Sequence, residues 1–260
     1  IGSRPIAWYG LLWAMVFMVG YYIMQKIYKR EKLGEEQLDK LLMYMLISTI
    51  VGARLGHCLF YEPAYYFSNP IKFLYVWEGG LASHGGAIGI LIGLYFYAKK
   101  IDKPYIWILD RIVVPVAIGG AFIRTGNLMN SEIYGQPTDL PWGFKFVRDY
   151  PVGMPIEDIP ACHPTQIYEA IFCIAVFIYL LYAYYRQNIA ERRPGFMFGI
   201  FLIVVFGSRI LIEFIKNHQV AFEDNMILDM GQWLSIPFFI AGVYFVVRSF
   251  SKTDKLNNRK

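Results

Sequence analysis

Apolar residues are grouped along the chain into seven blocks, which charged or proline-containing segments separate. Each block is close to the roughly 20 residues that an α-helix needs to cross the hydrocarbon core of a bilayer. The pattern therefore predicts an all-α integral membrane protein with about seven transmembrane helices. The expected spans are residues 6–25, 41–61, 81–98, 105–128, 165–185, 195–215 and 230–247.

Two connecting segments are long enough to have structure of their own. Residues 62–80 are rich in aromatic side chains and contain two prolines, and a helix in the membrane interface is expected over Ile71–Trp77. Residues 129–163 are rich in polar residues and proline. We expect a single membrane domain over residues 1–260, in which 129–163 form a small extracytoplasmic head between the fourth and fifth spans.

The positive charges predict the orientation of the chain. Of its 25 lysine and arginine residues, 16 fall in the loops on one side of the membrane, 5 fall on the other side, and the remaining 4 lie inside spans. Lysine and arginine accumulate in the cytoplasmic loops of membrane proteins. The N-terminus and the head are therefore expected outside and the C-terminus in the cytoplasm. Because the net charge of +5 follows this topology, it does not indicate a nucleic-acid partner.

The cysteines change this picture little. There are three, they are scattered, and two of them lie in apolar runs. Buried, inert thiols are the expected interpretation, and neither a disulfide framework nor a metal site is predicted. No cofactor is implied.

Four polar side chains in four different spans lie at a similar depth. Arg54, Arg124 and Arg209 come about four to seven residues before the outer ends of their spans, and His84 comes three residues after the outer start of its own. At about 1.5 Å per residue, these positions are roughly 5 to 10 Å below the outer boundary. Cations at membrane depth are costly and mark cavities, partners or ligand paths. The shared depth predicts one site in the outer leaflet.

Arg124 lies in the segment GGAFIRTGNLMNSEIYG, which runs from Gly119 to Gly135. Arg124 and Asn127 are three residues apart, so they share a helical face. The glycines on both sides permit close approach to the backbone. A guanidinium with amide neighbours matches the planar, two-pronged geometry of a phosphate. An anion site is the favoured interpretation, and a structural ion pair is the alternative.

The other polar residues of the spans have competing interpretations. Arg209 and Glu213 are four residues apart, which predicts an intrahelical ion pair that could also hold the guanidinium toward a ligand. His84 is flanked by glycines, so open surroundings are expected, and it is a general base, a hydrogen-bond donor or a structural residue. His163, before a proline, is either a helix-entry residue or part of the site.

The inventory lacks a covalent nucleophile. No nucleophile elbow, zinc motif or phosphate loop is present. A base and several cations suit direct transfer between two bound substrates, one of which carries a phosphate as leaving group. A lipid or anionic-solute transporter that uses the same arginines is an alternative, as is a purely structural membrane subunit.

Seven motifs follow one another over nearly the whole chain. They are WYG at 8–10, GARLG at 52–56, EGGLASHGG at 78–86, RTGNLMNSE at 124–132 followed by Gly135, HPTQIYE at 163–169, Arg209 with Glu213, and GQWLSIP at 231–237. In this order they resemble the prolipoprotein diacylglyceryl transferases, bacterial membrane enzymes that add diacylglycerol to lipoprotein precursors. Any one motif is weakly specific, but seven in order are highly specific.

The resemblance implies two substrates within the lipid bilayer of the bacterial inner membrane. These are phosphatidylglycerol and the signal peptide of a prolipoprotein with its lipobox cysteine. The diacylglyceryl group moves to the thiol, and glycerol 1-phosphate leaves.

By position, the resemblance also implies the residues of the site. The expected catalytic residues are Tyr9, His84, Arg124 and Arg209, and the expected phosphatidylglycerol-binding residues are Arg124, Asn127, Glu132, Gly135 and Glu213, the last of which holds Arg209. Arg54, from its depth in the second span, and His163, from its place at the entry to the fifth, are also expected to bind phosphatidylglycerol. One departure is the segment Val205-Phe206-Gly207, where members of the family often have Tyr-Gly. No role of that tyrosine hydroxyl is carried over to this chain.

Overall fold

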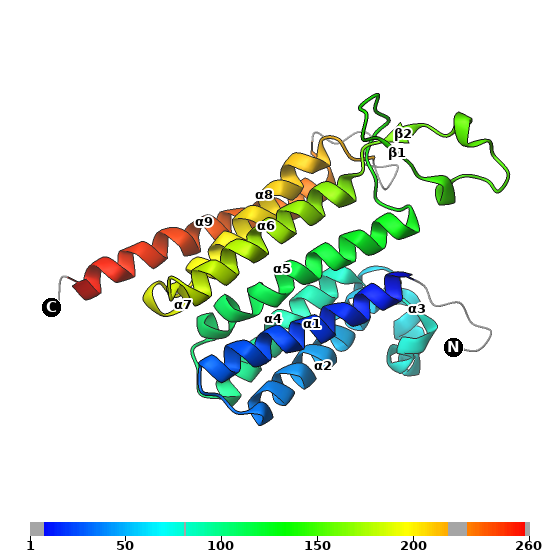
Figure 1. Cartoon of the computed structure of the whole chain (residues 1–260). Coiled ribbons are helices and arrows are strands. Elements are labelled where there is room, and N and C mark those ends of the chain that lie inside the picture. Colours follow the sequence, from blue (N-terminus) through cyan, green and yellow to red (C-terminus); the bar gives the residue numbers. More distant parts are fainter. Residues whose placement is uncertain (1–7, 81, 218–227, 258–260) are drawn as a thin grey trace. The chain divides into compact units, whose positions relative to one another are not determined.

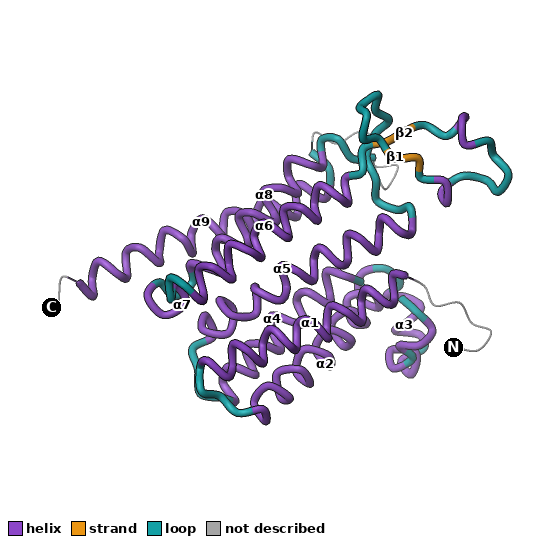
Figure 2. Tube along the Cα trace, viewed as in Figure 1, coloured by secondary structure: helices purple, strands orange, loops and turns teal. Residues whose placement is uncertain are grey.

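The structure is a computed structural model that describes residues 8–80, 82–217 and 228–257, most of them helical (Figures 1 and 2). The longer helices are α1 (Trp8–Arg30), α2 (Glu35–Phe60), α4 (Ser83–Lys100), α5 (Tyr105–Asn130), α6 (Thr165–Tyr185), α8 (Phe196–Glu213) and α9 (Met230–Asn257). In the described part of the chain, six of these are long and apolar enough to cross a membrane, α4 being the exception. The structure thus confirms an all-α integral membrane protein.

The third expected span corresponds to α4, which is 18 residues long. This helix begins with Ser-His-Gly-Gly and ends with two lysines, so its apolar stretch is shorter than those of the other long helices. Leu81, where the span was expected to begin, lies outside the described residues.

The chain divides into two compact units. One comprises residues 1–23 together with 110–260, and the other comprises Met24–Leu109. Of the predicted site residues, Arg54 and His84 belong to the Met24–Leu109 unit. The others belong to the larger unit.

In the Met24–Leu109 unit, α2 and α4 pack at a glycine-lined crossing. A Cβ atom on Gly56 would lie 2.7 Å from the Cα of Gly85, and a Cβ atom on Gly93 would meet the Ser48 side chain at 2.5 Å. Small residues in register allow two membrane helices to approach this closely. In the same unit, a hydrogen bond of 2.6 Å joins the hydroxyls of Tyr28 in α1 and Tyr97 in α4.

The connector after α2 does not form the predicted helix over Ile71–Trp77. Instead it contains α3 (Pro63–Ser68) and two 3₁₀ turns, Pro70–Leu74 and Val76–Glu78. Asn69 and Tyr75 interrupt helical geometry, with ψ angles of 68° and 66°. Proline favours the first positions of a helical turn, which explains where two of the three pieces start.

In the larger unit, α8 packs against both α6 and α9 (Figure 1). The start of α8 is capped by Asp110 of α5, whose carboxylate accepts hydrogen bonds from the backbone N–H groups of Gly195 at 2.6 Å and Phe198 at 2.9 Å. The first N–H groups of a helix lack partners within it, and a carboxylate satisfies them well. Asp110 thus fixes α8, which carries Arg209, to α5, which carries Arg124.

The segment between α5 and α6 contains little regular structure (Figure 2). Strand β1 (Phe144–Lys145) pairs antiparallel with β2 (Ala161–Cys162), and Phe144 lies opposite Cys162. The ring of Tyr134 stacks on Phe146 with centroids 4.3 Å apart. Burial, and then the hydrogen bond of the Tyr134 hydroxyl to Asp149, hold the pKa of Tyr134 above its usual range.

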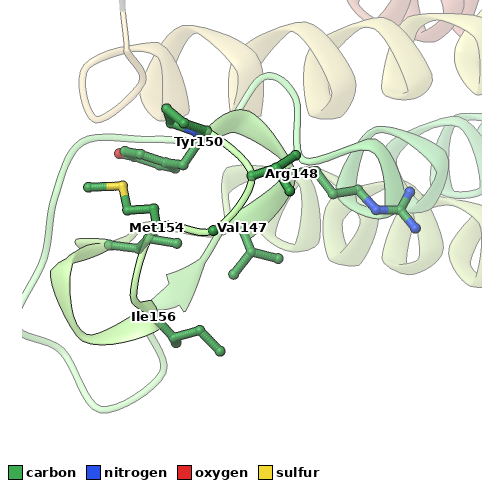
Figure 3. Close-up of a pocket in the computed structure, with 9 residues that line it drawn as sticks. Val147, Arg148, Tyr150, Met154 and Ile156 are labelled. Carbon is green, nitrogen blue, oxygen red and sulfur yellow. The ribbon is translucent and has the colours of Figure 1, made fainter.

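An open, mostly apolar pocket of about 450 Å³ lies in this segment (Figure 3). Its lining residues are Val147, Arg148, Tyr150, Pro151, Val152, Gly153, Met154, Ile156 and Ile159. The guanidinium of Arg148 points away from the pocket, and its Nη1 donates a hydrogen bond of 2.7 Å to the carbonyl oxygen of Met129. No residue of the predicted site lines this pocket.

Candidate functional site

Arg124 lies in the last two turns of α5, and one side of its guanidinium is held in place. Its Nε forms an ion pair with Glu169 of α6, and its Nη1 donates a hydrogen bond of 3.3 Å to the Oδ1 of Asn127. The side chain is 19% exposed, whereas that of Glu169 is 6% exposed. A guanidinium has five N–H donors. The described contacts occupy only part of them, so Arg124 has donors left for a ligand.

Asn127 connects Arg124 to the turn that follows α5. Its amide donates to the Oε1 of Glu132 at 2.8 Å, and Asn130 donates to the same oxygen at 3.3 Å. The backbone carbonyl of Glu132 accepts a hydrogen bond of 2.7 Å from Gln166 of α6. The structure therefore brings Arg124, Asn127 and Glu132 together, as the sequence predicted.

The turn itself has unusual backbone geometry. Ser131 and Ile133 have φ angles of 58° and 60°, on either side of Glu132. A β-branched residue such as Ile133 rarely adopts a positive φ, and such strain persists only where its surroundings impose it. Here Thr165 does so in part, because its hydroxyl donates to the carbonyl oxygen of Ile133 at 3.0 Å. The carboxylate of Glu132, in this turn, accepts hydrogen bonds from Asn127 and Asn130 at the end of α5.

A buried charge network continues from Glu169. Its second oxygen, Oε1, lies 2.9 Å from the Nζ of Lys216, and that Nζ lies 3.2 Å from the Oε2 of Glu213. The three side chains are 6%, 2% and 8% exposed, respectively. The expected ion pair between Glu213 and Arg209 is therefore not formed. Glu213 pairs with Lys216 instead. Lys216 follows α8 closely, and its ammonium group lies between the carboxylates of Glu169 and Glu213.

Arg209 has no counter-ion among the described residues. It lies half-buried on α8, and its Nε is buried without a hydrogen-bond partner in the described part of the chain. A buried charged donor that is left unsatisfied is costly. Arg209 is therefore a cation that an anion would stabilise.

The backbones of Gly135 and His163 are hydrogen-bonded to each other. The N–H of Gly135 donates to the carbonyl oxygen of His163 at 2.9 Å. A Cβ atom on Gly135 would lie 2.5 Å from the carbonyl oxygen of Ile215 and 2.8 Å from the Cβ of His163, so only glycine fits. The ring of His163 points to Tyr168, with Nδ1 and the hydroxyl 3.3 Å apart. Gly135 and His163 therefore hold together the backbone that follows α5 and the backbone that precedes α6.

Tyr9 of α1 lies against the helix that carries Arg124. A Cβ atom on Gly126 would lie 2.7 Å from the Cδ2 of the Tyr9 ring. The ring therefore packs on the backbone of α5 between Thr125 and Asn127. Tyr9, which the sequence predicted as a site residue, thus lies beside the helix that carries Arg124.

Arg54, in the Met24–Leu109 unit, has different partners. Its guanidinium donates to four backbone carbonyls of the connector, those of Lys72 at 2.5 Å, Phe73 at 3.2 Å, Gly79 at 2.5 Å and Gly80 at 3.3 Å. The residue is only 3% exposed. Arg54 therefore fixes the connector, and its described contacts leave little of the guanidinium available to an anion.

His84 is the second residue of α4 and is exposed. Of the glycines that flank His84, Gly80 and Gly85 are closely packed, whereas a Cβ atom on Gly79 would meet nothing within 4 Å. A Cβ atom on Gly85 would clash with the backbone of α2, and one on Gly80, whose φ is +71°, would lie 2.6 Å from the ring of His57. The glycines near His84 thus serve helix packing and a tight turn, while His84 itself is accessible.

Two charged residues of the network, Glu169 and Lys216, were not predicted from the sequence. Glu169 lies at the end of the HPTQIYE motif, five residues after Pro164 and on the same face as Gln166. That position was a usable signal. Lys216 gave none, because in sequence it is one of the few cations of an outer loop.

Comparison with known proteins assigns the family. The family model described as "Prolipoprotein diacylglyceryl transferase" matches residues 1–248. The chain belongs to this family. Its relatives in the prolipoprotein diacylglyceryl transferase family include proteins of Porphyromonas gingivalis, 48% identical over 98% of this chain and 93% of the relative, and of Tolumonas auensis, 45% identical over 96% and 93%. A protein of Chloroherpeton thalassium is 43% identical over 98% and 92%.

All three relatives carry the name phosphatidylglycerol–prolipoprotein diacylglyceryl transferase. The resemblance drawn from the seven motifs is therefore confirmed at the level of the family. A transferase is favoured over the transporter alternative.

Proposed function

We propose that the protein transfers the diacylglyceryl group of phosphatidylglycerol to the thiol of the lipobox cysteine of prolipoproteins. The thiol sulfur forms a bond to the carbon of the diacylglyceryl group that is linked to the phosphate. The bond between that carbon and the phosphate oxygen breaks. Glycerol 1-phosphate leaves with the electron pair, and the thiol proton passes to a base. The names of the relatives and the cationic groups of the larger unit support this reaction.

The observation that carries the proposal is the state of Arg124. Glu169 and Asn127 fix one side of its guanidinium, and the remaining donors lie in a partly exposed side chain. Oriented donors that already sit where negative charge develops stabilise a departing phosphate without reorganisation. Arg124 is therefore proposed to bind the headgroup phosphate, while Asn127 and Glu132 complete the pocket wall.

Arg209 is proposed as the second cation of the reaction. Its half-buried guanidinium has no counter-ion among the described residues, so a phosphate or a developing charge on the leaving group would satisfy it. Glu213 acts on the site through Lys216 rather than by holding Arg209. Gly135 and His163 set the backbone that closes over these charges.

The remaining roles are proposed from the motifs. His84, exposed at the start of α4, is proposed as the base that accepts the thiol proton, with a role as headgroup ligand as the alternative. Tyr9, packed on Gly126, is proposed to line the headgroup site. Arg54 is proposed to contribute indirectly, through the connector that its guanidinium holds.

The location is proposed as the bacterial inner membrane, with the N-terminus and the 129–163 segment outside and the C-terminus in the cytoplasm. The distribution of positive charge supports this orientation. A cysteine that replaces Asp139, which is exposed, is expected to react with an impermeant thiol reagent on intact spheroplasts, and one that replaces Asn257 is not. The opposite labelling pattern contradicts the orientation.

The reaction is tested by incubating the purified protein with phosphatidylglycerol and a synthetic lipobox peptide. The expected product is a peptide heavier by one diacylglyceryl group, together with free glycerol 1-phosphate. A peptide in which serine replaces the lipobox cysteine is the control and is expected to stay unmodified. An unmodified cysteine peptide contradicts the proposal.

A further inference from the structure

We propose that Lys216 is a positioning residue of the headgroup site, which holds Glu169 and thereby fixes the ion pair that orients Arg124. The inference rests on the proposed function, because it gives Lys216 a part in the binding of phosphatidylglycerol. Lys216 acts through Glu169 and is not assigned a contact with the substrate.

The geometry is that of one carboxylate shared between two cations. Oε2 of Glu169 pairs with the Nε of Arg124, and Oε1 lies 2.9 Å from the Nζ of Lys216. The two contacts fix both the position and the rotation of the carboxylate. Because Arg124 is held through its Nε, the orientation of the carboxylate decides where the Nη atoms point.

The charges explain why a second cation is needed there. An Arg124–Glu169 pair alone would be neutral, and a phosphate would have to compete with Glu169 for the guanidinium. Lys216, which is 2% exposed, takes up part of the negative charge of Glu169 and also faces Glu213. A buried cation exerts a strong field because solvent does not screen it. Glu213 balances the charge of Lys216, so the effect of Lys216 on Arg124 comes through its hold on the Glu169 carboxylate rather than through added net charge.

The backbone fixes Lys216 in this place. Lys216 and Gly135 form an antiparallel bridge, and the N–H of Gln136 donates to the carbonyl oxygen of Ile215 at 2.9 Å. The N–H of Lys216 itself donates to the carbonyl oxygen of Glu213 at 3.1 Å. This bridge requires the close approach that glycine permits at position 135. Gly135, in the loop after α5, thus fixes the backbone of Lys216 and thereby the position of its ammonium group beside Glu169 and Glu213.

The test compares the apparent KM for phosphatidylglycerol with kcat in mixed detergent micelles, for the wild type and four variants. In Lys216→Met the KM is expected to rise roughly tenfold, the effect of losing one charge-assisted contact, with a smaller change in kcat. Lys216→Arg, which keeps the charge, is expected to restore most of the affinity. Lys40→Met is the matched control, because Lys40 also pairs with a glutamate, Glu36, but on the exposed surface. Its KM is expected to stay at the wild-type value.

A charge-balanced double variant keeps the proposal testable where Lys216→Met does not fold. Lys216→Met combined with Glu213→Gln removes one buried charge of each sign, so it avoids an uncompensated carboxylate. Its melting temperature is expected to lie near the wild-type value while its KM stays raised roughly tenfold. A wild-type KM in a folded Lys216→Met or in the double variant overturns the positioning role. Failure of the wild type to form the thioether overturns the proposed function instead.

Discussion

Arg54 and Arg124 are two arginines inside apolar helices, and each has glycines nearby in the sequence, yet their surroundings differ. Arg54 is 3% exposed, and its guanidinium donates to four backbone carbonyls of the connector that follows its own helix. Arg124 has a side chain that is 19% exposed, and it is held through one carboxylate and one amide. The first guanidinium is nearly saturated and the second is not.

The difference shows which feature of a membrane arginine indicates a binding site. The depth predicted from the sequence and the adjacent glycines are shared by both residues, so neither feature separates them. The partners do. Carbonyls of a loop consume donors and fix the loop, whereas a single carboxylate on one side of the guanidinium orients it and leaves the rest of its donors for an anion.

The sharpest way to break this comparison is to change Arg124 while keeping its charge. Arg124→Lys is expected to lower kcat/KM for phosphatidylglycerol by roughly 10³-fold, because an ammonium cannot both pair with Glu169 and contact phosphate through a planar fork. Thioether formation on a lipobox peptide measures it. The control is Arg186→Lys, at an exposed arginine of the loop after α6, which is expected to keep wild-type activity. A near wild-type rate in Arg124→Lys shows that only diffuse charge matters.

The next largest effect is expected for His84, the proposed base. His84→Gln is expected to lower the transfer rate roughly 10²-fold, a typical contribution of a positioned base, while phosphatidylglycerol binding is retained. The rate is measured between pH 6 and 9, since the thiol of a free cysteine ionises with a pKa of about 8.5. Loss of binding in parallel with rate assigns His84 to the headgroup, and full recovery at high pH removes the need for a base.

A second histidine of the same unit provides the control for that series. His57 stacks on Tyr61 and lies under Gly80, so it has a packing role. His57→Gln is expected to lower the melting temperature and to leave the pH dependence of the rate unchanged.

The smallest effect on activity is expected for Arg54. Arg54→Lys keeps one or two of the four hydrogen bonds and is expected to lower the free energy of unfolding by about 2 to 4 kcal/mol, the range for lost buried hydrogen bonds of a charged group. Activity per folded molecule is expected to fall by no more than about fivefold. Chemical denaturation in detergent and the peptide assay together measure this. A loss of activity without a loss of stability contradicts the assignment of Arg54 to the connector.

Much of the fold was predictable from the sequence. The apolar blocks located the long helices because burial in lipid demands that length and that composition. The connector was not predictable, since Arg54 reaches 18 to 26 residues along the chain to fix its carbonyls, and no local pattern reports such a contact. For α4, the polar ends of the block reduced the length of the apolar stretch.

The candidate site was predictable in part. Arg124, Asn127 and Glu132 are close in sequence, and helical geometry brings them together. The predicted partner of Glu213 was wrong. The spacing of four residues favours a local pair with Arg209, whereas the chain after α8 folds back and places Lys216 beside Glu213. Lys216 itself is brought in by a bridge to Gly135, some 80 residues away in sequence.

The most direct test of the difference between the two arginines is the equilibrium affinity of the purified protein for phosphatidylglycerol, without the peptide substrate. We predict that Arg124→Lys weakens binding by at least about tenfold and that Arg54→Lys changes it by less than about threefold, both compared at equal folded protein. Equal losses in the two variants, or a larger loss in Arg54→Lys, would contradict the proposal that the open guanidinium of Arg124 is the one that binds the phosphate.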